Sequence, residues 1–200
     1  MPEVINRYLA SFDEIHRGTI VYTEAILAAE KLTKEEKHEA ICDFILDYLI
    51  DSYLLGLETG REFFGFEAER DMDAMRRVIE KKIDGKTFRD RVSDHLEEKS
   101  PGLMANLADS EFHRVFNEAE MEAAMQFEKL TGRTMYKTWR TVGDNRVRDT
   151  HDYIDGVKKE LHQKFRTFDD DEASAPGGFN KAENNAGCRC WLVISASEKT

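Results

Sequence analysis

Hydrophobic side chains recur every three or four positions through most of residues 1–130, and this spacing predicts amphipathic helices. One helix should begin after Thr33, whose hydroxyl can cap it, because Glu36 follows three residues later as in a capping box. Gly56 and Gly60 interrupt the hydrophobic pattern, and glycine is common just beyond the end of a helix. We therefore expect this helix to end near these two glycines.

Three more helices are predicted before Gly132, and residues that favour caps or turns separate them. They cover residues 63–83, 87–96 and 110–130. Asp84 and Gly85 separate the first two, and Thr87 is positioned to begin the second. The sequence Ser-Pro-Gly at residues 100–102 predicts a loop ahead of the third.

The pattern changes after Gly132, where β-branched and aromatic residues mix with polar ones as in a half-buried strand. The predicted elements are a strand at 135–141, a turn at 142–145, a short helix at 146–154 and a closing strand at 190–194. Residues 157–168 fit either a strand or irregular structure. Four consecutive acidic residues and a Pro-Gly-Gly sequence predict a long loop at 169–187, and residues 195–200 are expected to fray.

Together these elements predict an α+β fold. Residues 1–131 form a predominantly helical N-terminal region. Residues 132–200 form a small C-terminal α+β domain with a short antiparallel sheet and the long loop at 169–187.

Composition narrows the classes of function. The chain has 200 residues with 29 Lys and Arg against 40 Asp and Glu, a net charge of −11, so it does not coat DNA by bulk charge. Residues 133–166 are a local exception with nine basic and five acidic residues. Three cysteines are too few for a disulfide framework, which favours a reducing compartment.

The sequence also predicts no association with a membrane. No run approaches 18 consecutive apolar residues, as a membrane-spanning helix requires. The opening residues Met-Pro-Glu-Val lack the basic and apolar segments of a signal peptide.

The C-terminal third contains a set of residues that we expect to form one structural cluster. Its members are Trp139, Asp144, Arg148, His151, Gly156, Cys188 and Cys190. Asp144 can cap the helix that follows it, and Gly156 is expected to take a positive φ at the end of that helix. Arg148 and His151 lie three residues apart on one helix face. Cys188 and Cys190 lie two apart, so on a strand they point to the same side, where a helix side chain can meet them.

Two interpretations of the cysteines remain open. Thiolate and imidazole are zinc ligands, so His151, Cys188 and Cys190 can bind Zn²⁺, with a fourth ligand from Asp144, Asp155 or His162. The alternative, which we favour because the Cys-x-Cys spacing is unusual for a zinc knuckle, is a pair of small buried thiols beside a hydrogen-bonded histidine.

Two further hypotheses concern nucleic acid. Arg146, Lys158, Lys159 and Lys164 can contact DNA phosphates, although a solvated surface balanced by nearby aspartates explains them as well. His151 can be interpreted as the acid–base group of a nuclease-like effector. Because no nucleophile motif accompanies it, we expect a structural network and no enzymatic activity.

The order of motifs in residues 132–194 resembles the phage Mu F-like head morphogenesis family, the minor head proteins of tailed phages and prophages. The resemblance lies in the segment from Trp139 to His151, the Asp-Gly pair ending at Gly156, Phe165, a Pro-Gly loop and the sequence Cys-Arg-Cys at 188–190. The chain departs from the family pattern in having Gly187 in place of an asparagine before the first cysteine. It also lacks a Thr-Glu pair on the preceding helix.

This resemblance implies a low-copy structural protein inside the phage head, present in the host cytoplasm during assembly. The implied partners are the portal protein, the major capsid protein or both, and packaged DNA is a further candidate. The resemblance implies a role in head morphogenesis and in DNA packaging or delivery. A nuclease-like effector and a DNA-binding module remain the alternatives.

Overall fold

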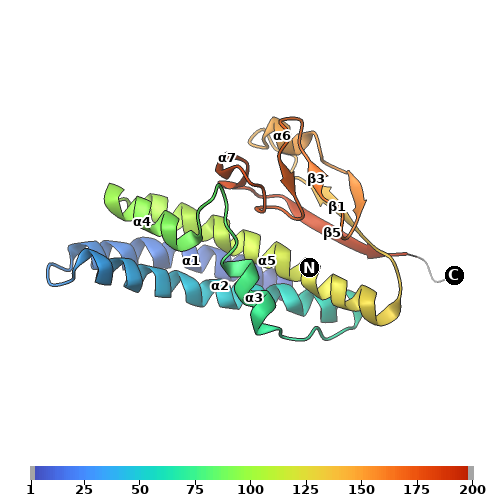
Figure 1. Ribbon diagram of the computed structural model, residues 1–200, viewed down its shortest axis with the longest axis horizontal. Helices are drawn as coiled ribbons and strands as arrows, with labels where there is room; N and C mark the ends of the chain where they lie inside the picture. The colour runs from blue at the N-terminus through green and yellow to red at the C-terminus, as the bar shows by residue number, and fades with distance from the viewer. Residues whose placement is uncertain (1–2, 198–200) are drawn as a thin grey trace.

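The structure of the protein is a computed structural model that describes residues 3–197. The helices are α1 (Glu3–Ala28), α2 (Lys34–Phe64), α3 (Met72–Ile79), α4 (Phe88–Glu98), α5 (Pro101–Thr131), α6 (Asp149–Asp152) and α7 (Ala182–Asn185). The strands are β1 (Met135–Arg140), β2 (Lys158–Glu160), β3 (Phe165–Arg166), β4 (Glu172–Ala173) and β5 (Trp191–Ala196). The predicted α+β class is confirmed. Figure 1 shows α1, α2 and α5 side by side, with the sheet on the other side of α5.

Local capping signals place the starts of the helices. Thr33 and Glu36 form the predicted capping box of α2, and Thr87 forms a second one at α4. The loop predicted at 100–102 is wrong, because α5 begins there. Ser100 accepts a hydrogen bond from the backbone N–H of Leu103, and Pro101 occupies the first helical position, where its missing N–H has no cost.

The predicted end of α2 is also wrong, since the helix continues through both glycines to Phe64 and ends at Gly65. The reason is tertiary. A Cβ atom at Gly56 would lie 2.5 Å from the carbonyl oxygen of Phe116 and 2.6 Å from Cβ of Ala119. Glycine at this position therefore allows α2 and α5 to approach each other closely.

The main sheet has three antiparallel strands in the order β2-β1-β5. Lys137 of β1 pairs with Lys159 of β2 and with Ile194 of β5. Strands β3 and β4 form a separate two-stranded sheet, so the segment 157–168 contains two short strands. The helix predicted at 146–154 is reduced to α6, flanked by turns.

The segment 169–187 is packed against the domain and contains β4 and α7, in contrast to the predicted loop. Asp171 is only 2% exposed, and its carboxylate accepts hydrogen bonds from the backbone N–H groups of Glu172, Asn180 and Lys181 at 2.9–3.0 Å. One residue of the acidic run is therefore buried and holds this segment together through hydrogen bonds, whereas the sequence predicted a long loop.

A few residues at each end of the chain lie outside the described residues. Ser195 and Ala196 belong to β5, so the predicted frayed tail begins later than expected, and residues 198–200 lie outside the described residues. Met1 and Pro2, on which the absence of a signal peptide partly rests, also lie outside them. Within residues 3–197, no helix has the length and apolar character that crossing a membrane requires.

Two hydrophobic cores lie on opposite sides of α5. The first joins the helices and includes Leu49 of α2 and Phe112 of α5. The second surrounds Trp139 and includes Met121 and Ala124, both from α5. Helix α5 therefore contributes side chains to both hydrophobic cores.

Close packing of α2 against α5 makes Gly56 sensitive to substitution. Gly56→Ala should lower the free energy of unfolding by about 1–3 kcal/mol, because the added methyl group collides with the backbone of α5. The matched control is Gly102→Ala in α5, where nothing lies within 4 Å of an added Cβ, and it should be neutral or slightly stabilising. Urea denaturation followed by circular dichroism measures both values. Equal changes in the free energy of unfolding for the two variants would contradict the close approach of α2 and α5 at Gly56.

Candidate functional site

His151 lies on α6 with 1% of its surface exposed. Its ring stacks on Phe179 at a centroid distance of 5.3 Å and meets the edge of Trp139 at 5.6 Å. Trp139 belongs to β1 and is fully buried. These aromatic contacts fix the orientation of the imidazole.

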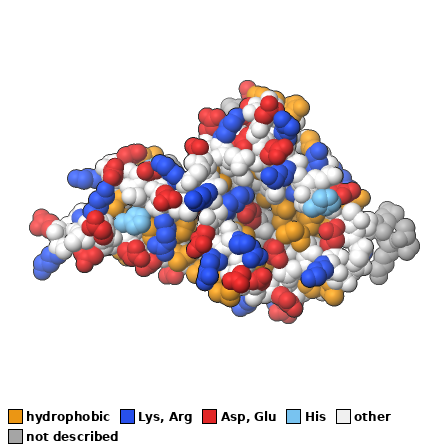
Figure 2. Space-filling model, in the orientation of Figure 1, with side chains coloured by type: hydrophobic (Ala, Val, Ile, Leu, Met, Phe, Trp, Pro, Cys, Tyr) orange, Lys and Arg blue, Asp and Glu red, His pale blue; other side chains and the backbone are white. Residues whose placement is uncertain are grey.

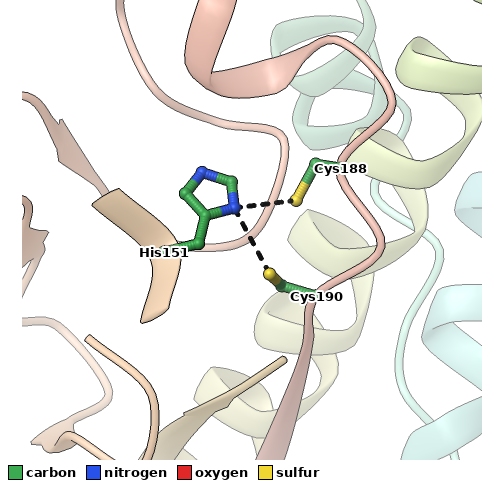
Figure 3. Close-up of side chains that lie close together, drawn as sticks. All are labelled: His151, Cys188 and Cys190. Atoms are coloured by element: carbon green, nitrogen blue, oxygen red, sulfur yellow. Dashed lines mark hydrogen bonds between the residues drawn. The ribbon is translucent and has the colours of Figure 1, made fainter. Parts of the chain in front are cut away.

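The two cysteines converge on one nitrogen of this ring. Nδ1 of His151 lies 3.7 Å from Sγ of Cys188 and 3.3 Å from Sγ of Cys190, and Figure 3 shows the three side chains pointing toward one another. The three atoms lie within 4.8 Å of one another, and all three residues are buried. Cys188 precedes β5 instead of lying on it, so the predicted common orientation arises in an irregular segment.

Hydrogen bonds hold the segment that carries the cysteines. The backbone N–H of Cys188 donates to the carbonyl of Asn185 at 3.0 Å, and Arg148 donates to the carbonyl of Ala186. Nε2 of His113 on α5 donates to the carbonyl of Cys190 at 2.8 Å. Since Nε2 is then the donor, Nδ1 of His113 accepts from the hydroxyl of Tyr8 at 2.6 Å, which connects the site to α1.

Asp144 fixes the adjacent Arg189 but does not cap a helix, because α6 begins five residues later. Its carboxylate binds the guanidinium of Arg189 through two hydrogen bonds of 2.7 and 2.8 Å. These bonds, with one from the backbone N–H of Arg146, lower the pKa of Asp144. Gly156 takes the expected positive φ, 73°, and its N–H donates to the carbonyl of Trp139.

The two thiols titrate as a pair. The hydrogen bond from Cys190 lowers the pKa of Cys188, and the same bond raises the pKa of Cys190. The pair therefore favours a single thiolate that is hydrogen-bonded to the remaining thiol. Thiolate and imidazole are the donors that proteins use for Zn²⁺.

The fourth ligands considered from the sequence do not join this group. Asp144 is engaged by Arg189, and Asp155 accepts a hydrogen bond from the backbone N–H of Thr141 at 2.8 Å. His162 has an exposed side chain next to Glu160. Only His151 and the two cysteines come together.

The structure does not gather the four candidate DNA-contacting residues on one face. Arg146 lies in an exposed turn beside Asp144, and Lys164 is exposed after β2. Lys158 and Lys159 are consecutive in β2 and so point to opposite faces of the sheet, with Lys158 over the ring of Tyr136. On the face shown in Figure 2, basic and acidic side chains are intermixed.

Several buried polar residues near the site were not among those predicted from the sequence. Lys137 lies on the same face of β1 as Met135 and Trp139, where it is fully buried, and its ammonium donates to the carbonyl of Ser174 at 2.8 Å. Burial lowers the pKa of Lys137 to about 8. His113, a residue to which the sequence assigns no site, contacts the cluster through Cys190.

An apolar groove of about 770 Å³ runs between the helices and β5, next to the cluster. Tyr8 and Phe12 of α1, Phe116 of α5 and the segment 188–194 contribute to its lining. Glu120 of α5 also lines the groove, and burial raises the pKa of its carboxyl group to about 8.

Comparisons with known proteins identify the chain. A model of a family of phage head-related proteins, described as Phage Mu protein F like protein, matches residues 72–193. This match covers more than half of the sequence, so the chain belongs to the phage Mu protein F like family. No curated protein and no solved structure matches the chain. The matched region begins at α3, earlier than the motifs of residues 132–194, and therefore includes all of α5.

Glu120 should make stability depend on pH. Its pKa rises from 4.5 to about 8 on folding, so its stabilising contribution is present at acidic pH and is lost as the pH rises toward about 8. Glu120→Gln removes this loss, and near pH 8 the variant should be more stable than wild type by roughly 2–4 kcal/mol.

Urea denaturation between about pH 5.5 and pH 8.5 tests this expectation. Glu24→Gln, at an exposed position of α1, is the matched control and should follow the wild-type profile. A constant difference between Glu120→Gln and wild type across this range would contradict the assignment.

Proposed function

We propose that this protein is a minor head protein of a tailed phage or prophage, acting in head morphogenesis and in DNA packaging or delivery. It works by binding the portal protein, and the major capsid protein is the alternative partner. Its place is the interior of the virion head, after assembly in the host cytoplasm. Membership of the phage Mu protein F like family supports the head-related part of this proposal.

The apolar groove is the main observation that supports a function through protein–protein contact. Large hydrophobic side chains along it are exposed, among them Trp191 at 43% and Val193 at 47%. Contiguous exposed apolar surface of this kind is typical of interaction sites. The charged residues of the lining are Glu120 and Arg189, and Arg189 is paired with Asp144, so the groove suits an apolar protein segment better than a nucleic acid.

The free edge of β5 provides the second half of this contact surface. In β1, both the N–H and the carbonyl of Trp139 bond toward β2, so the groups of Thr138 face Val193 of β5. The backbone groups of Leu192 and Ile194 therefore point away from β1. An extended segment of the portal protein can pair with this edge while its side chains enter the groove.

Burial of His151 supports a structural role over the nuclease alternative. The imidazole is 1% exposed, and Nδ1 faces two thiols. General acid–base catalysis needs a group within hydrogen-bond reach of the substrate. We propose a non-enzymatic protein whose cluster serves to hold the segment before β5.

Replacing one exposed side chain of the groove should disrupt binding. Val193→Asp places a charge in an apolar contact, so the affinity for the portal protein of the same phage should fall at least about tenfold, equivalent to about 1.4 kcal/mol. Co-purification and titration calorimetry with the portal protein, and separately with the major capsid protein, measure this change.

The matched control is Val21→Asp, since Val21 is an exposed valine of α1 that does not line the groove. It should bind like wild type. Unchanged affinity of Val193→Asp would show that the groove is not part of the binding surface. Failure of the wild-type protein to bind either head component would overturn the proposed function.

A further inference from the structure

We propose that the protein binds one Zn²⁺ ion through Nδ1 of His151 and the sulfur atoms of Cys188 and Cys190. The ion would join α6 to the segment that leads into β5. This inference does not depend on the portal contact.

The separations of the three atoms fit a tetrahedral zinc ion. Zn–S bonds of about 2.3 Å and Zn–N bonds of about 2.0–2.1 Å place a nitrogen and a sulfur ligand about 3.6 Å apart. The corresponding distances here are 3.7 Å to Cys188 and 3.3 Å to Cys190. Both nitrogen–sulfur distances therefore lie within a few tenths of an ångström of the tetrahedral value, and the two sulfur atoms lie within 4.8 Å of each other.

The chemistry of the cluster also favours a metal ion. Nδ1 of His151 faces both sulfur atoms, and each of the three atoms offers a lone pair to a cation once the thiols are deprotonated. A divalent cation satisfies all three donor atoms and offsets the charge of two thiolates. Two soft sulfur ligands and one imidazole suit Zn²⁺ and disfavour Mg²⁺ and Ca²⁺, which prefer oxygen.

Surrounding contacts hold the three ligands in place in advance. The ring of His151 packs against Trp139 and Phe179, and this packing directs Nδ1 at the sulfur atoms, while Nε2 has no hydrogen-bond partner within residues 3–197. The backbone of the Cys-x-Cys segment is fixed from α5 by His113. Such outer contacts normally orient metal ligands.

The fourth coordination position is suited to a water molecule. Among residues 3–197, no other His, Cys, Asp or Glu side chain joins the group. Both nitrogens of His113 are engaged, by Tyr8 and by the carbonyl of Cys190. A cavity of about 10 Å³ lies beside His151 and Cys190, which is about the space that one water needs.

Metal analysis of the full chain tests this site. Elemental mass spectrometry of protein purified from cells supplied with zinc should find about one Zn²⁺ per chain. Cys190→Ala should reduce the zinc content to about a tenth or less. The matched control is Cys42→Ala, because Cys42 is a buried cysteine of α2 outside the cluster, and it should retain the ion.

A second measurement keeps the test valid if Cys190→Ala does not fold. Wild-type protein loaded with Co²⁺ should show thiolate-to-cobalt charge-transfer absorption and the visible bands of a tetrahedral ion. Modification of the thiols in folded, zinc-loaded protein should release Zn²⁺ in step with loss of Cys188 and Cys190. Wild-type protein without zinc and without the cobalt bands would overturn the proposal, as would full zinc content in folded Cys190→Ala.

Discussion

The ion pair between Arg114 and Glu111, buried in the middle of α5, is the interaction that joins α3 and α4 to this central helix. The guanidinium of Arg114 donates to Glu111 at 2.7 Å and to the carbonyl of Val78 at the end of α3 at 2.7 Å. Arg91 of α4 reaches the same carboxylate at 2.8 Å. Breaking such a group leaves an uncompensated buried charge, so it restricts α3, α4 and α5 to one arrangement. A Cβ at Gly177 would lie 2.9 Å from Cβ of Arg114, so the segment 169–187 packs directly against Arg114.

The family match begins at the helices that Arg114 joins to α5. The matched region, residues 72–193, contains α3, α4, α5 and strands β1 to β4, and it ends within β5. Helices α1 and α2 lie outside the match and cover the other side of α5. The His-Cys cluster and the long helix therefore belong to one packing unit, linked by His113.

Local signals in the sequence predicted local structure, and tertiary packing decided the rest. The capping box of Thr33 involves neighbouring residues, so the pattern alone predicted it. Gly56 was misinterpreted because its role depends on α5, about sixty residues away. The convergence of His151 with the cysteines followed from their spacing and from the family resemblance. His113 and Glu120 were missed because nothing in a single sequence distinguishes a buried polar residue from an exposed one when its partners are distant. Lys137 alternates in phase with Met135 and Trp139, so the strand pattern does indicate its inward-facing position.

The cluster and the groove are connected through the start of β5. Cys190 contributes its sulfur to the cluster and its carbonyl to His113, and the next residue begins the strand. Side chains alternate along a strand, so a slip of one residue at this point would turn Trp191 and Val193 into the core and Leu192 outward. Fixing Cys190 from two sides therefore sets which side chains of β5 are buried and which backbone groups form its free edge. In this way the buried cluster determines the exposed surface of β5.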